Sequence, residues 1–148
     1  MGVEEPDELP AELRTLIARL GRRLRQTRAG ADLTSSHYQV LATTMRNGPL
    51  RLTDLASLEG LNPTMLSRIV GKLEAAGLVE RRQDREDGRV AHLAVTREGR
   101  ELVNRVRSER NDALSRALGG LDDEQRGLLV AAMPVLESLA ESLAELPR

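Results

Sequence analysis

The fold is decided by residues 62–95, NPTMLSRIVGKLEAAGLVERRQDREDGRVAHLAV. The Asn-Pro pair at 62–63 is a strong helix start and Gly77 is a helix stop, so the first half predicts a helix. After Gly77 the spacing of the apolar residues changes from helical to alternating. Residues 78–83 and 90–95 therefore predict two short strands joined by a charged tip. Such a hairpin is too small to fold alone, so it must lean on neighbouring helices.

Periodic apolar residues and capping signals on both sides of this stretch predict further helices. These helices cover approximately residues 9–28, 35–46, 53–58, 96–118 and 122–146. Two helices joined by a tight turn and followed by a hairpin describe a winged helix-turn-helix. We therefore expect a mainly α fold with a small β-hairpin. We divide the chain into three parts: an N-terminal dimerisation helix at 1–30, a winged helix-turn-helix at 31–99 and C-terminal dimerisation helices at 100–148.

Pro134 lies inside the last helical pattern. Proline removes a backbone donor and its ring clashes with the preceding turn of a helix. The sequence therefore predicts a kink or a break near Ala132.

The composition bounds the function. The 148 residues suffice for one domain, and 22 basic against 23 acidic side chains give a net charge of −1, so any basic surface must be local. The chain has no cysteine, which excludes disulfides and thiolate chemistry. Acidic residues open the chain where a signal peptide would be basic, and no run of about 18 apolar residues stands out. We expect a cytoplasmic protein with no membrane partner.

The predicted helix that starts at Pro63 has two different faces. Its inward positions are all aliphatic, at Leu66, Ile69, Val70 and Leu73. Its outward positions carry no acid, and they are Thr64, Ser67, Arg68, Gly71 and Lys72. Hydroxyls and an arginine near a helix start suit phosphate contact and recognition of guanine in a major groove. The alternative is an ordinary solvated face.

The hairpin tip is rich in arginine, with Arg81, Arg82, Arg85 and Arg89 in one short segment. Arginine suits the narrow and strongly negative minor groove of DNA. Asp87 can hold Arg89 in one orientation through a charge-assisted hydrogen bond. A salt-bridged surface turn is the alternative interpretation.

At this point the sequence resembles the winged-helix core of the MarR family of bacterial transcriptional regulators. The resemblance covers 52 residues, from Gly48 to Gly99. It is carried by the combination of Leu55-Ala56, Ser67-Arg68, Leu73-Glu74, Gly77-Leu78-Val79, Arg81, Asp87, Arg89, Thr96 and Gly99. Gly88 departs from the family, in which many members carry an arginine at the wing tip. Arg51 likewise stands where members often have a Thr or Ser cap.

The resemblance implies a set of DNA-binding residues. Thr64, Ser67 and Arg68 would contact the major groove, while Arg89 would enter the minor groove braced by Asp87. Lys72 joins this set by its place on the outward helix face, and Arg85 by its place in the wing.

The terminal helices have apolar positions that need a partner, and the simplest partner is a second copy of the chain. An intramolecular three-helix bundle is the alternative. Residues 101–148 carry nine acidic and six basic side chains, so this part should face away from DNA. The arginines of the first helix either touch phosphates or are simply solvated.

No enzyme motif is present, and we expect neither catalytic residues, nor a metal site, nor a cofactor. His37 and His92 lack the spacing of metal ligands. The family resemblance implies a small anionic aromatic effector bound between the dimerisation helices and the winged helix. The nearest polar groups by sequence order are His37, Tyr38 and Arg14, although Tyr38 can equally well pack the second helix.

The sequence thus predicts a homodimeric regulator, a repressor, that binds double-stranded DNA at a near-palindromic operator and is released by an effector. A helical protein-interaction module with a vestigial winged helix is the alternative, because a fold does not by itself determine a function.

Overall fold

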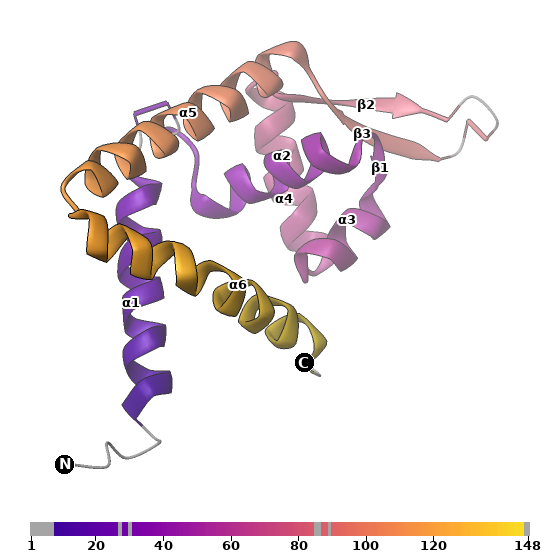
Figure 1. The fold of residues 1–148 in the computed structure, drawn as a ribbon. Coiled ribbons are helices and arrows are strands. Elements are labelled where there is room, and N and C mark those ends of the chain that lie inside the picture. The colour runs from indigo at the N-terminus through magenta and orange to yellow at the C-terminus, as the bar shows by residue number, and fades with distance from the viewer. Residues whose placement is uncertain (1–7, 27, 30, 85–86, 89, 147–148) are drawn as a thin grey trace. The chain divides into compact units, whose positions relative to one another are not determined.

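The computed structural model describes residues 8–26, 28–29, 31–84, 87–88 and 90–146. The chain forms two compact units, of which the first ends at Arg110 and the second begins at Asn111. Figure 1 shows helices throughout and a small sheet near the middle of the chain. The predicted fold class, mainly α with a winged helix-turn-helix, is confirmed.

The first unit contains most of the elements. They are α1 (Glu8–Arg25), α2 (Ser35–Asn47), β1 (Leu50–Arg51), α3 (Leu52–Glu59), α4 (Pro63–Ala75), β2 (Val79–Gln83), β3 (Ala91–Val95) and the start of α5 (Arg97–Gly119). The capping residues act as predicted. The Asn62 side chain accepts a hydrogen bond from the Met65 amide at 2.8 Å, and Gly60 ends α3 in a left-handed conformation.

The sheet has the order β1-β3-β2, and both pairings are antiparallel. In the hairpin, Val79 pairs with Val95 and Gln83 with Ala91. The strand β1 was not predicted, because two residues carry no alternation. It forms because Leu50 lies opposite Leu93 on the free edge of β3.

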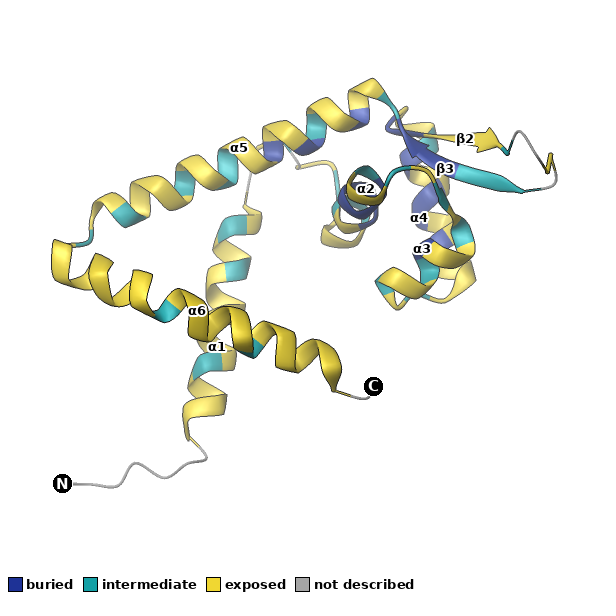
Figure 2. Cartoon of the chain, turned by 45° about the vertical axis from the view of Figure 1, so that its right-hand side comes forward, coloured by how far each residue is buried: buried dark blue, intermediate teal, exposed yellow. Residues whose placement is uncertain are grey.

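The core of the first unit lies where α2, α3 and α4 meet the sheet and the first turns of α5. Figure 2 shows the buried residues gathered there. The largest fully buried side chains are Leu41, Leu55, Leu66, Leu73, Leu93, Val40, Val70, Val103, Val106 and Thr44. This cluster holds α4 by one face only, so its opposite face remains exposed.

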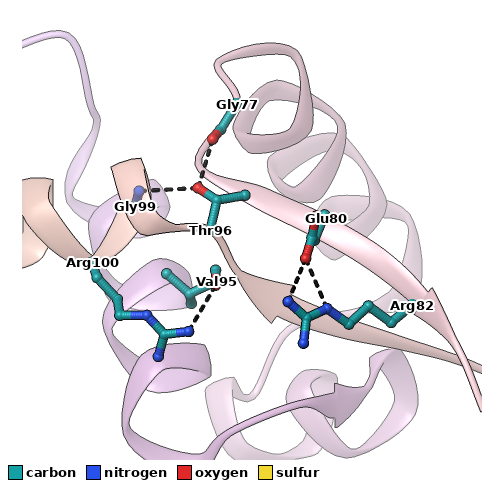
Figure 3. A network of polar contacts seen from close by, with 7 residues as sticks. All are labelled: Gly77, Glu80, Arg82, Val95, Thr96, Gly99 and Arg100. Carbon is teal, nitrogen blue, oxygen red and sulfur yellow. Dashed lines mark hydrogen bonds and ion pairs between the residues drawn. The ribbon is translucent and has the colours of Figure 1, made fainter.

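Thr96 joins three elements at the base of the wing (Figure 3). Its hydroxyl donates to the Gly77 carbonyl at 2.7 Å and accepts from the Gly99 amide at 3.1 Å. The second bond caps α5 as the sequence predicts. The end of α4, the end of β3 and the start of α5 are therefore locked together.

The helix α1 buries no residue. After α1, the backbone amides of Arg28 and Ala29 donate to the Glu109 carboxylate of α5, at 2.8 and 3.2 Å. This carboxylate anchors the chain between α1 and α2. The apolar side of α1 stays open, with Leu16, Ile17 and Leu20 between 42% and 52% exposed.

The second unit consists of the last turns of α5 together with the whole of α6 (Asp123–Glu145). Asp122 and Gln125 form the predicted capping box. Of the predicted kink or break near Ala132, the break is wrong, because α6 continues through Pro134, and the kink stays a prediction. Proline deprives the Val130 carbonyl of its helical partner, but Val130 is 70% exposed and water can satisfy that carbonyl.

The helix α6 buries no residue either. By length and composition alone it is apolar enough to cross a membrane. Its exposed apolar side chains are Leu128, Leu129, Val130, Met133, Val135, Leu136, Leu143 and, just beyond its end, Leu146. These side chains need a covering partner.

Candidate nucleic-acid interface

The helix α4 presents the two faces that the sequence predicts. Leu66, Val70 and Leu73 are at most 2% exposed, and Ile69 is also buried. The outward residues Thr64, Ser67, Arg68, Gly71 and Lys72 are all exposed. Because the inward face is packed into the core, these five residues are held on a rigid element and face away from the core.

The N-terminal half of this face is suited to DNA. The first turn of α4 carries no acid. Pro63 has no amide hydrogen and the Met65 amide is bonded to Asn62, so the Thr64 amide is the one left at the helix start for an acceptor such as a phosphate. Within the described residues no ion pair engages Arg68. Its guanidinium is therefore available for bidentate hydrogen bonds to guanine.

Lys72 lies on the flank of the same face. It is exposed, yet it also lines a cavity beside His37 and Arg105. Lys72 thus lies between the outward face of α4 and this cavity. Its predicted contact with DNA stays a prediction.

The wing is described only in part. Arg85 and Arg89 lie outside the described residues. Asp87 is described, and its carbonyl accepts a hydrogen bond from the Val90 amide at 2.9 Å. The predicted brace between Asp87 and Arg89 therefore stays a prediction.

The other two arginines of the wing are engaged within the fold. Arg81 pairs with Glu74 of α4 at 3.0 Å, and Arg82 pairs with Glu80 at 2.6 Å. The second pair is drawn in Figure 3. Both pairs are solvent-exposed and contribute little to stability, but they turn these guanidinium groups toward carboxylates of the same chain. These pairs belong to β2 and not to the tip, so the salt-bridged surface turn stays an open alternative for the tip.

Two of the cavities beside α2 share Leu33 and Thr34. The smaller has a volume of about 190 Å³ and is lined by Arg25, Leu33, Thr34, Ser35, Tyr38, Val106 and Arg110. The Arg110 guanidinium lies over the Tyr38 ring, 4.3 Å from its centroid, in cation–π geometry. Tyr38 therefore packs against α5, which was the alternative that the sequence left open.

The larger cavity has a volume of about 420 Å³. Its charged and polar lining groups are Asp32, Thr34, His37, Lys72 and Arg105, and its apolar lining is formed by Ala29, Leu33, Ala76, Leu78 and Leu102. Two permanent cations and one carboxylate leave it net positive. A concave site with mostly apolar walls and a few polar groups is the usual form of a small-molecule site.

His37 has an unusual environment. Its Nδ1 is hydrogen-bonded to the Thr34 hydroxyl, and its Nε2 is buried without a hydrogen-bond partner among the described residues. Burial lowers the pKa of His37 below its usual value of 6.5, and the positive charge of Lys72 lowers that pKa further. The imidazole is therefore neutral at pH 7. When the Thr34 hydroxyl donates to Nδ1, the ring proton lies on Nε2, which becomes a buried donor without an acceptor.

The residues predicted for a ligand do not gather in one place. His37 lines the larger cavity and Tyr38 the smaller one. Arg14 is exposed on α1 and lines neither.

Sequence reasoning missed Arg105 and Arg110 of α5. Arg110 follows Val103 by seven residues and Val106 by four, so it falls on the buried face of that helix. A charged residue on an apolar helix face was the signal that could have identified it.

Comparisons with known proteins agree with this geometry. The model of the MarR family matches residues 33–91. An HTH-type transcriptional regulator of Mycobacterium leprae is 30% identical over 135 residues, which cover 90% of this chain and 94% of that protein.

Solved structures resemble the whole chain. A crystal structure of a transcriptional regulator of Pseudomonas aeruginosa is 33% identical with a TM-score of 0.83, covering 94% of this chain and 99% of that one. FabT of Streptococcus pneumoniae, crystallised in complex with DNA, has a TM-score of 0.65 at 17% identity and covers 93% of this chain and 95% of its own. The likeness to FabT is one of fold.

Proposed function

We propose, because this chain belongs to the MarR family of transcriptional regulators, that two copies of it bind a near-palindromic operator in double-stranded DNA and repress transcription. Each copy inserts α4 into a major groove and its wing into the flanking minor groove. In a two-fold dimer the half-sites lie about one helical turn apart. Such a protein acts on DNA in the cytoplasm.

The observation that supports this proposal is the outward face of α4. It combines exposed hydroxyls, no acid and an Arg68 that has no ion pair among the described residues with an inward face that is buried. Phosphate contacts position a protein on DNA, and base contacts specify the sequence. Thr64 and Ser67 suit the first task, and Arg68 suits the second.

The test is a binding assay on DNA from the region upstream of the protein's own gene. Arg68→Ala should weaken operator binding by about 1–3 kcal/mol and relax the base preference, whereas Arg89→Ala should weaken binding to all sequences alike. Arg107→Ala is the charge-matched control, because Arg107 is exposed on α5, outside α4 and the wing. If both Arg68→Ala and Arg89→Ala bound a genuine operator like the wild type, this interpretation would fail.

The open apolar faces of α1 and α6 support the proposed dimer. Neither helix buries a residue, yet both carry large aliphatic side chains. A second copy covers such faces in an isologous interface. The same covering explains why α6 resembles a membrane span in composition.

Analytical ultracentrifugation tests the dimer. The double variant Ile17→Glu/Leu20→Glu should sediment as a monomer of about half the wild-type mass and lose operator binding. Ala18→Glu is the control, since Ala18 lies on the opposite side of α1. A wild-type chain that is monomeric and ignores DNA would instead favour a protein-interaction module.

Release from DNA is assigned to an anionic aromatic effector in the larger cavity. Its volume of about 420 Å³ lies within the usual range for ligand sites, whereas 190 Å³ does not. Lys72, Arg105 and the unpaired Nε2 of His37 favour a carboxylate. An occupant drawn to Lys72 would pull that side chain away from DNA.

Titration with 2-hydroxybenzoate and 4-hydroxybenzoate tests this assignment. Binding should raise the melting temperature and lower operator affinity. Arg105→Ala should abolish both effects, and Arg107→Ala should leave them intact. An unchanged melting temperature and an unchanged operator affinity with both compounds would refute the effector site.

A further inference from the structure

Gly71 lies in the middle of the exposed face of α4. It follows Ser67 by four residues and Arg68 by three, so all three share one side of the helix. A glycine in the interior of a helix is unusual, because only proline is a poorer helix former.

Nothing inside the protein requires glycine at this position. The described glycines with positive φ are Gly48, Gly60 and Gly77, so the backbone of Gly71 would accept any residue other than proline. A Cβ added to Gly71 would meet no atom of the described residues within 4 Å. The same is true of Gly127 in α6, so what distinguishes Gly71 is its place on the helix face that carries Ser67 and Arg68. At Gly99, by contrast, an added Cβ would lie 2.1 Å from the Leu78 carbonyl oxygen, which explains that glycine from within the fold.

Glycine at position 71 therefore makes α4 less stable than alanine would, and no contact among the described residues compensates for that loss. The face on which Gly71 lies is the face assigned to DNA. Glycine is the residue that permits a backbone to approach a ligand closely.

We propose that Gly71 is a contact position of the recognition helix, where the bare backbone of α4 packs directly against DNA. An α-helix with side chains is 10–12 Å across and the major groove is about 12 Å wide, so one side chain decides how deeply the helix enters. Without a side chain at position 71, Arg68 reaches the base edges from a helix that lies close to the groove. This inference rests on the proposed DNA binding.

The test compares Gly71→Ala with the wild type in two measurements. The variant should melt higher by about 1–4 °C, because alanine favours the helix and the site is open. Its operator affinity should fall about fivefold or more, and Gly71→Leu should bind still more weakly. The two readouts move in opposite directions, so a folding defect cannot produce the result.

Asn104→Ala is the matched control. Asn104 is exposed in the interior of α5, where alanine also raises helix propensity. This variant should gain stability and keep the wild-type operator affinity. The affinity ratio between the wild type and Gly71→Ala should also stay constant from about 50 to about 200 mM salt, because a steric effect releases no counterions.

Equal or tighter operator binding by Gly71→Ala would overturn the proposal. If Arg68→Ala still weakened binding in the same assay, the proposed function would stand while the role of Gly71 fell. A wild-type protein that bound no DNA would remove both.

Discussion

Substitution of Thr96 tests whether its hydroxyl holds the base of the wing to α4 and α5. Its hydroxyl bonds to the Gly77 carbonyl at 2.7 Å and to the Gly99 amide at 3.1 Å (Figure 3). Thr96→Val keeps the shape of the side chain and removes both bonds. The Gly99 amide belongs to a buried residue, so the loss leaves a donor poorly satisfied.

The magnitude follows from the two bonds. Loss of a helix cap typically costs about 1 kcal/mol, and loss of a further hydrogen bond costs about the same. Thr96→Val should therefore lower the free energy of unfolding by about 2 kcal/mol. For a chain of this length the melting temperature should fall by about 4–8 °C.

Urea denaturation measures this change, and Thr96→Ser is the control because it keeps the hydroxyl. We expect a lower midpoint for Thr96→Val at an unchanged slope. For Thr96→Ser we expect a free energy of unfolding within about 0.5 kcal/mol of the wild type. Equal midpoints for the two variants would show that the hydroxyl does not hold the wing.

Three other predictions concern the same unit. Gly99→Ala should destabilise the protein by about 3 kcal/mol, measured by thermal melting, because its Cβ would lie 2.1 Å from the Leu78 carbonyl oxygen and 2.8 Å from Val95 Cγ1. Glu109→Ala should lower the free energy of unfolding by about 1 kcal/mol. It should also speed hydrogen exchange at the amides of Arg28 and Ala29, because the Glu109 carboxylate accepts hydrogen bonds from both. The lowered pKa of His37 means that the unfolded chain binds more protons below pH 6.5, so stability should fall as the pH drops through that value. His37→Gln should flatten this fall in a series of urea titrations, and an unchanged pH profile would contradict the environment described for His37.

The local elements could be predicted because their signals lie within a few residues. The Asn62-Pro63 start, the Asp122–Gln125 capping box and the glycine stops each act through hydrogen bonds to neighbouring backbone. The inward and outward faces of α4 follow from the helical period alone. The candidate DNA-contact residues of that helix were therefore accessible to sequence reasoning.

Pro134 shows the limit of such a local rule, which predicted a kink or a break where the structure has no break. The rule counts a lost hydrogen bond but not the solvent that can replace it. In α6 the affected turn is exposed, so the helix continues.

The amino-acid sequence by itself determined the order of the elements, the winged helix and the composition of its recognition face, because periodicity and capping are properties of neighbouring residues. Only the tertiary structure decided what distant residues do together. It pairs β1 with β3, lays Arg110 on Tyr38, and sets His37 beside Lys72 and Arg105 around one cavity. These contacts join residues far apart along the chain, and they form because the core packs in one way.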